Sequence, residues 1–188
     1  MNKTIFVITF LFFSNFILAQ SVNDLDVKNG FRHLKLGSSP SQIKNIVKTE
    51  NQFSKNPNVV EYDYVGSDID NVFNVKVDKV SLSFFKNKLF NISVTFGNLE
   101  YSKDFEVYEF NSIFSALEKT YGTDWFRPQN NDGIILNGAI WDGKNIRLEL
   151  FRLDFNKSKS NPQDYGFISG YINVFDKKLT NEMFSSDF

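Results

Sequence analysis

Few side chains in this sequence could carry out catalysis or hold a metal ion. His33 is the only histidine among the 188 residues, and there is no cysteine. The chain therefore has no thiol nucleophile, no thiolate metal site and no pair of histidine ligands. His33 lies in a segment typical of a strand, which favours a structural role over a place in a catalytic triad.

Acidic residues are the second source of chemistry. Residues 68–71 and 130–133 could gather oxygen ligands for calcium, but neither has the spacing of a calcium loop, which spreads its ligands over roughly twelve positions. Both are typical of solvated turns. A hydrolase that uses a pair of carboxylates stays open, because 22 acidic side chains always allow some such pair. No residue stands out, so we expect a protein that is not an enzyme and has no cofactor and no metal.

Aromatic side chains are the remaining candidates for a binding site. Trp125 and Trp141, with neighbouring tyrosines, could stack on a sugar ring, and carbohydrate or small-ligand binding is the alternative function. The preferred hypothesis places a binding surface on the exposed face of a sheet, because soluble monomers seldom expose large apolar patches without a function. The aromatic residues that alternation directs to that face are Phe85, Phe151, Phe167 and Tyr171.

Strict alternation of apolar and polar residues predicts the sheet itself. It is clearest in residues 80–86 and 89–96, which a short turn separates, so these strands should pair antiparallel. Asp142-Gly143 is a strong hairpin signal between two later strands. Further strands are expected at residues 31–36, 59–65, 71–77, 134–141, 145–154 and 165–175.

Two helices are expected. Residues 103–121 carry apolar side chains at alternating spacings of three and four, before Gly122 as a stop. Those side chains are Val107, Phe110, Phe114, Leu117 and Tyr121. A shorter helix is predicted at residues 40–49, opened by Ser39 and Pro40. Residues 176–188 are expected to form one helical turn or to fray.

This order predicts an α+β fold: an antiparallel meander with one long and one short helix packed on one face. A helix followed by a meander occurs twice, which leaves open two helix-plus-meander halves. An eight-stranded membrane barrel is the structural rival, and the long helix disfavours it.

Residues 1–19 are typical of a secretory signal peptide, with Lys3, an apolar run at residues 5–13, and Ala19 before the expected cleavage point. After cleavage, residues 20–188 would form a single α+β domain, periplasmic or secreted, with no membrane span. The alternative is an uncleaved N-terminal anchor. With 21 basic and 22 acidic side chains the chain has a net charge of −1, which gives no reason to expect a nucleic-acid partner.

Residues 31–43 resemble the strand–Gly–Ser–helix opening of small bacterial envelope proteins, which include the outer-membrane-assembly small lipoproteins and the β-lactamase-inhibitor-protein-like fold. The strand–turn–strand unit of residues 80–96 is similar to theirs as well. The resemblance implies a helical layer behind a sheet whose open face binds a protein partner. The chain lacks a lipobox cysteine, so lipid tethering does not carry over. We therefore expect an exported, non-enzymatic interaction module of the cell envelope.

Overall fold

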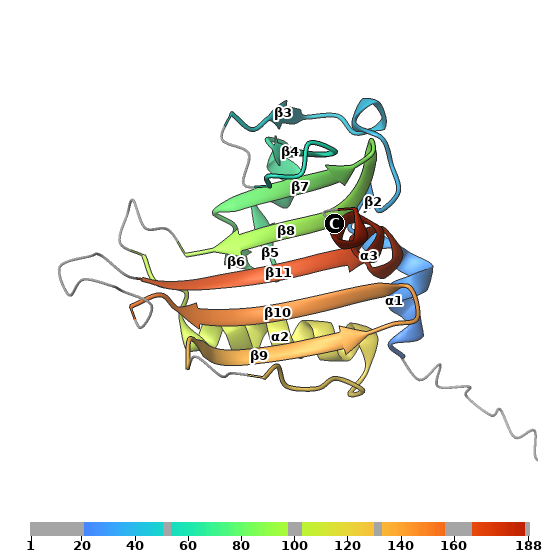
Figure 1. Ribbon diagram of the computed structural model, residues 1–188. Coiled ribbons are helices and arrows are strands. Elements are labelled where there is room, and N and C mark those ends of the chain that lie inside the picture. Colours follow the sequence, from blue (N-terminus) through green and yellow to red (C-terminus); the bar gives the residue numbers. More distant parts are fainter. Residues whose placement is uncertain (1–20, 51–53, 98–102, 130–132, 157–166, 187–188) are drawn as a thin grey trace, which may run out of the picture.

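The computed structural model describes residues 21–50, 54–97, 103–129, 133–156 and 167–186. Seven strands form one fully antiparallel sheet in the order β3-β4-β7-β8-β11-β10-β9 (Figure 1). Their bounds are β3 Ile46–Lys48, β4 Val59–Tyr64, β7 Lys79–Phe85, β8 Lys88–Phe96, β9 Ile135–Asp142, β10 Ile146–Asp154 and β11 Ile168–Asp176. Together with the helices on the sheet, this arrangement confirms the α+β prediction.

Helix α2, Val107–Tyr121, covers one face of the sheet, as expected. Its buried apolar stripe meets the inward side chains of the strands in one core. The helix begins later than predicted because Glu106 is extended, and its backbone N–H donates to the Glu109 carboxylate at 2.9 Å. Gly122, with φ of 82°, follows the last turn, as expected.

A short helix that the sequence did not indicate, α1 (Asn23–Lys28), packs beside α2 and against β10. Its Asp26 carboxylate accepts three backbone N–H groups from the β9–β10 turn, at 2.8 Å from Lys144, 2.7 Å from Asn145 and 2.9 Å from Ile146. The hairpin expected at Asp142-Gly143 is present. Neither of these residues has a positive φ, so the turn is not the expected type I′, and Asp26 holds it in place.

The helix predicted at residues 40–49 is wrong. The predicted opening is present, since the Ser39 N–H donates to the Gln42 side chain at 2.8 Å, but it leads only to the 3₁₀ turn η1, Pro40–Gln42. Asn45 then has φ of 59°, which ends any helix, and the following β-branched residues form the edge strand β3. Only the second meander therefore directly follows a helix, namely α2.

Two predicted strands are instead tight hairpins. Residues 31–36 form β1 (Gly30–Phe31) and β2 (Leu34–Lys35), and residues 71–77 form β5 (Asn71–Val72) and β6 (Val75–Lys76). Arg32 in the first turn, and Phe73 and Asn74 in the second, have positive φ values that no strand tolerates. Apolar residues from both hairpins extend the core beside α2: Phe31, Leu34, Val72 and Val75.

The C-terminal segment is a third helix, α3, Lys177–Ser185, where a single turn or fraying was expected. The Asp176 side chain caps it by accepting the Leu179 N–H at 2.9 Å. Figure 1 shows α3 on the side of the sheet opposite α2, across the ends of β8 and β11. Helices α1 and α2 lie on the same face, although the short helix was expected at residues 40–49 and not at α1, whereas α3 covers one end of the other face.

Candidate functional site

We call the side of the sheet away from α2 the open face. Along β7, β8, β10 and β11, most residues that point toward α2 are buried, whereas most of their neighbours on the open face are partly accessible. Small polar side chains occupy the middle of the open face. This polar strip consists of Ser81, Ser83, Asn91, Ser93, Thr95 and Asn173.

An aromatic cluster lies beside the polar strip. Phe151 on β10 is directly opposite Tyr171 on β11. The Phe155 ring centroid is 6.4 Å from that of Tyr171 and 5.9 Å from that of Phe167. All four side chains are half-buried. The structure thus brings together three of the four predicted site residues, and adds Phe155, which the sequence analysis missed.

Phe85, the fourth predicted residue, does not belong to this cluster. It does lie on the side away from α2, but it is fully buried. Phe85 packs with Val59 and Phe90 in a small second core, which Leu179 and Met183 of α3 cover. The prediction that Phe85 is exposed is wrong because α3 was not expected to form and to pack on this face.

Glu149 is the acidic residue next to the polar strip. It is directly opposite Asn173, which lies opposite Ser93, so a polar row crosses three adjacent strands. Burial raises the pKa of the Glu149 carboxyl, while the nearby Arg147 charge and a hydrogen bond from Asn173 act in the opposite direction. Asn91 lies in the same polar strip, and its buried Oδ1 has no hydrogen-bond partner within the described residues.

Asp142 lies in ion pairs at the α3 end of the open face. Arg147 donates to both of its oxygens, at 2.9 and 3.1 Å, and the Lys177 ammonium approaches Oδ1 to 2.9 Å. The Arg147 hydrogen bond is the largest cause that lowers the pKa of Asp142. These pairs join the start of α3 to the β9–β10 hairpin.

Asp142 is a poor partner for Glu149 in the carboxylate pair that a glycoside hydrolase needs. Glu149 has a raised pKa, but its neighbour Asp142 is engaged by two cations. Four cavities in the described part of the chain are each lined by at most one carboxylate. The described residues therefore give no specific support to the hydrolase hypothesis.

His33 belongs to a polar cluster that fastens the β1–β2 turn to β4. Its Nδ1 lies 3.1 Å from Asp68 Oδ2, and its Nε2 lies 3.3 Å from the Tyr64 hydroxyl. That hydroxyl donates to Asp68 Oδ1 at 2.5 Å, and this bond is the main cause of the lowered pKa of Asp68. Asp68, considered above as a calcium ligand, lies in the 3₁₀ turn η2, Ser67–Ile69, with both oxygens engaged. Of residues 130–133, only Gly133 lies within the described residues.

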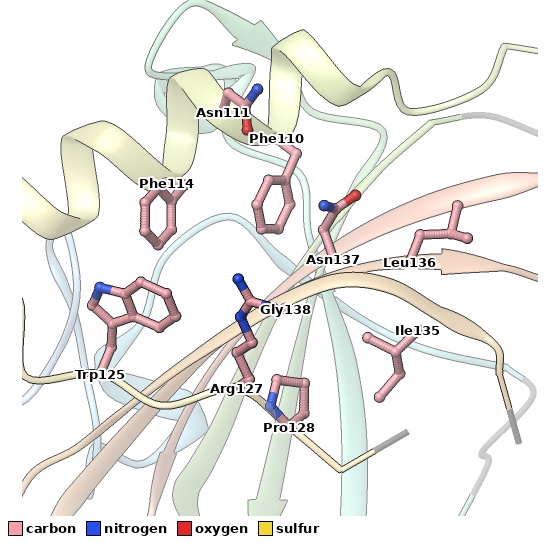
Figure 2. Close-up of a pocket in the computed structure, with 10 residues that line it drawn as sticks. All are labelled: Phe110, Asn111, Phe114, Trp125, Arg127, Pro128, Ile135, Leu136, Asn137 and Gly138. Carbon is pink, nitrogen blue, oxygen red and sulfur yellow. The ribbon is translucent and has the colours of Figure 1, made fainter. Parts of the chain in front are cut away.

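The two tryptophans have different environments. Trp141 is fully buried, and its Nε1 donates to the Gly122 carbonyl at 2.9 Å, so it belongs to the core and offers no surface to a sugar. Trp125 is half-buried and lines a pocket of 440 Å³ between α2 and β9 (Figure 2). The pocket is lined by Phe110, Asn111, Phe114, Trp125, Arg127, Pro128, Ile135, Leu136, Asn137 and Gly138.

The described parts of the chain contain no group of three or more acidic or histidine side chains that could hold a metal ion. They also contain no helix with the length and apolar character needed to cross a lipid bilayer.

Comparison with known protein families identifies a matching domain. A family model described as the TP0088 domain matches residues 29–184, from the end of α1 to the last turns of α3. No curated protein and no solved structure matches the chain. The whole sheet, α2 and the open face lie within the matched residues.

Proposed function

The chain belongs to the TP0088 domain family, and we propose that it is an exported, non-enzymatic module that binds a protein partner through the open face of its sheet. One observation carries the proposal. Phe151, Phe155, Phe167 and Tyr171 gather at one place on a face that is otherwise rich in serine, threonine and asparagine.

The composition of the open face suits protein recognition. Tyrosine and phenylalanine provide large contact areas at low cost in side-chain entropy, and serine and asparagine provide adaptable hydrogen bonds. Aromatic anchors beside a polar surface are typical of the residues that dominate binding energy at protein interfaces. The aromatic cluster and the polar strip supply these two parts side by side.

The backbone that carries the aromatic cluster is held on both sides. β10 pairs with β9 and β11, and β11 pairs with β10 and β8. Phe151 and Tyr171 therefore lie on interior strands, and the geometry of this surface changes little between the free and bound states. A preformed surface reduces the entropy lost on association.

Glu149 specifies part of the partner's chemistry. Its carboxylate is half-buried, its pKa is raised by burial, and its cationic neighbour Arg147 is already paired with Asp142. A partner that places a lysine or arginine over Glu149 would compensate this charge. We expect an interface with an apolar side chain over the aromatic cluster and a basic side chain over Glu149.

The place of action follows from the N-terminal segment. Residues 1–19 have the pattern of a signal peptide, so the mature chain would meet its partner in the periplasm or outside the cell. Mass spectrometry of the protein isolated from the cell envelope tests this part, with Gln20 as the expected first residue.

Paired serine substitutions test the binding surface. We expect the mature protein carrying F151S and Y171S to lose its partner, because both anchors of the aromatic cluster are gone. Y108S is the matched control, since Tyr108 is a similarly large aromatic residue, 67% exposed, on α2. Equal partner binding by the F151S/Y171S and Y108S proteins, with both folded by circular dichroism, would contradict the proposal.

A further inference from the structure

We infer that the pocket between α2 and β9 is a second binding site, for a small ring-shaped ligand that carries a carboxylate. Neither the aromatic cluster nor the polar strip contributes a lining residue. The walls of the pocket come from α2, from residues 125–128 and from β9. Its volume of 440 Å³ is within the range of small-molecule sites, roughly 300–1,000 Å³.

One wall of the pocket is aromatic and rigid. The Trp125 indole is fixed by a hydrogen bond from its Nε1 to the Glu118 carboxylate at 3.0 Å. Its ring lies edge-on to that of Phe114, with centroids 5.0 Å apart and planes at 89°. Phe110 stacks on Phe114 at 6.1 Å. A flat sugar or aromatic ring would find a preorganised apolar surface here.

Three polar side chains of the pocket are free to bind a ligand. Among the described residues, the side chains of Asn111, Arg127 and Asn137 have no hydrogen-bond or ion-pair partner. Figure 2 shows Arg127 and Asn137 directed toward α2, into the space that Phe110 and Phe114 border. Three uncommitted polar side chains that line one pocket are the feature expected of a ligand site.

The charge of the pocket selects a carboxylate. Arg127 is the charged residue of the lining, and no described lining residue is acidic. A guanidinium binds a carboxylate through two parallel hydrogen bonds, and such charge-assisted bonds are about twice as strong as neutral ones. The Asn111 and Asn137 amides can bond to hydroxyl groups on the ring. Acidic sugars and aromatic carboxylic acids share this chemistry.

Titration calorimetry with four probes tests the inference: D-glucuronate and phenylacetate as carboxylates, D-glucose and benzyl alcohol as their neutral counterparts. We expect at least one carboxylate to bind, and its neutral counterpart to bind at least about tenfold more weakly, which corresponds to about 1.4 kcal/mol. Binding of glucuronate would identify the ligand as an acidic sugar, and binding of phenylacetate would identify it as an aromatic carboxylic acid. Equal binding of a carboxylate and its counterpart would overturn the inference, and so would no binding of any probe at about 10 mM.

Two variants locate the site. We expect R127Q to weaken carboxylate binding at least about tenfold. K48Q, which removes one charge from the exposed edge strand β3 at the far side of the sheet, should leave it unchanged. Arg127 is exposed and unpaired among the described residues, so R127Q should fold normally. An equal effect of both variants would overturn the assignment.

Side-chain amide signals in ¹H–¹⁵N spectra separate this site from the proposed protein interface. The carboxylate probe should shift the signals of Asn111 and Asn137 and leave that of Asn173 on the open face in place. A shift at Asn173 without shifts at Asn111 and Asn137 would overturn the inference. Neither result depends on whether the open face binds a protein.

Discussion

Phe151 and Tyr171 are direct cross-strand neighbours in the aromatic cluster. They belong to β10 and β11, which pair along nine residues each without a register shift. The Phe155 ring meets Tyr171 at an interplanar angle of 84°, an edge-to-face contact that fixes the position of both rings. The sheet therefore presents these aromatic side chains in one defined arrangement, and the proposed interface depends on that arrangement.

Packing of α3 on the open face should contribute strongly to stability. Phe85 is fully buried beneath Leu179 and Met183, so F85A should lower the free energy of unfolding by about 3–5 kcal/mol. The matched control is F184A, because Phe184 lies on α3 itself but is 59% exposed, and it should change stability by less than about 0.5 kcal/mol. Urea denaturation measures both. A small effect of F85A would show that α3 does not pack there.

Asp26 should be important for the β9–β10 turn. Its carboxylate accepts three backbone N–H groups, so D26A should cost about 2 kcal/mol or more. D26N keeps one of the two acceptor oxygens, so it should lower the free energy of unfolding less than D26A does. Amide hydrogen exchange of Lys144, Asn145 and Ile146 should speed up in D26A. Unchanged exchange at these three amides would contradict the role given to Asp26.

Stability should fall in acid through Asp142. Its pKa is lowered in the folded state by Arg147 and Lys177, so below the ordinary value of 3.8 the unfolded chain binds more protons than the folded one. The contribution of Asp142 is present above that value and is lost as pH falls through the lowered pKa. D142N should be less stable than the wild type at pH 7, and the difference should shrink toward pH 2. Thermal unfolding over this range measures it, and a constant difference would contradict the prediction.

The charged Glu149 carboxylate, unlike that of Asp142, should lower the stability of the free protein at neutral pH. Its pKa is raised by burial, so the folded state holds the proton more tightly, and the charged carboxylate destabilises the free protein at neutral pH. E149Q should therefore raise the unfolding temperature at pH 7, and the gain should disappear as pH falls through the raised pKa toward the ordinary value of 4.5. An E149Q protein less stable than the wild type at pH 7 would show that the charge is already compensated.

Clear periodicity made part of the fold predictable. The stripe on α2 and the alternation in β7 and β8 each repeat over several turns or pairs, so local sequence and packing agree. The helix prediction for residues 40–49 was wrong. The spacing of Ile43, Ile46 and Val47 fits a helix, but Asn45 adopts a left-handed conformation that ends it. The two small hairpins were not predicted because their turns need a positive φ at Arg32 and Phe73, and these residue types rarely adopt it.

The candidate site was predictable only where strands are long. Alternation placed Phe151 and Tyr171 on the same face of the sheet, and continued by four residues it would also have found Phe155. It could not show that α3 covers Phe85, because that contact joins segments far apart in the chain. The Trp125 pocket was hidden for the same reason, since its walls come from three separate segments.

Site-specific photocrosslinking in intact cells tests the proposed interface most directly. A photoreactive phenylalanine analogue at position 171 should give a discrete adduct with one protein partner. The same analogue at position 108, on α2, should give none. Absence of an adduct from position 171, or equal adducts from both positions, would contradict the proposal that the open face binds a protein.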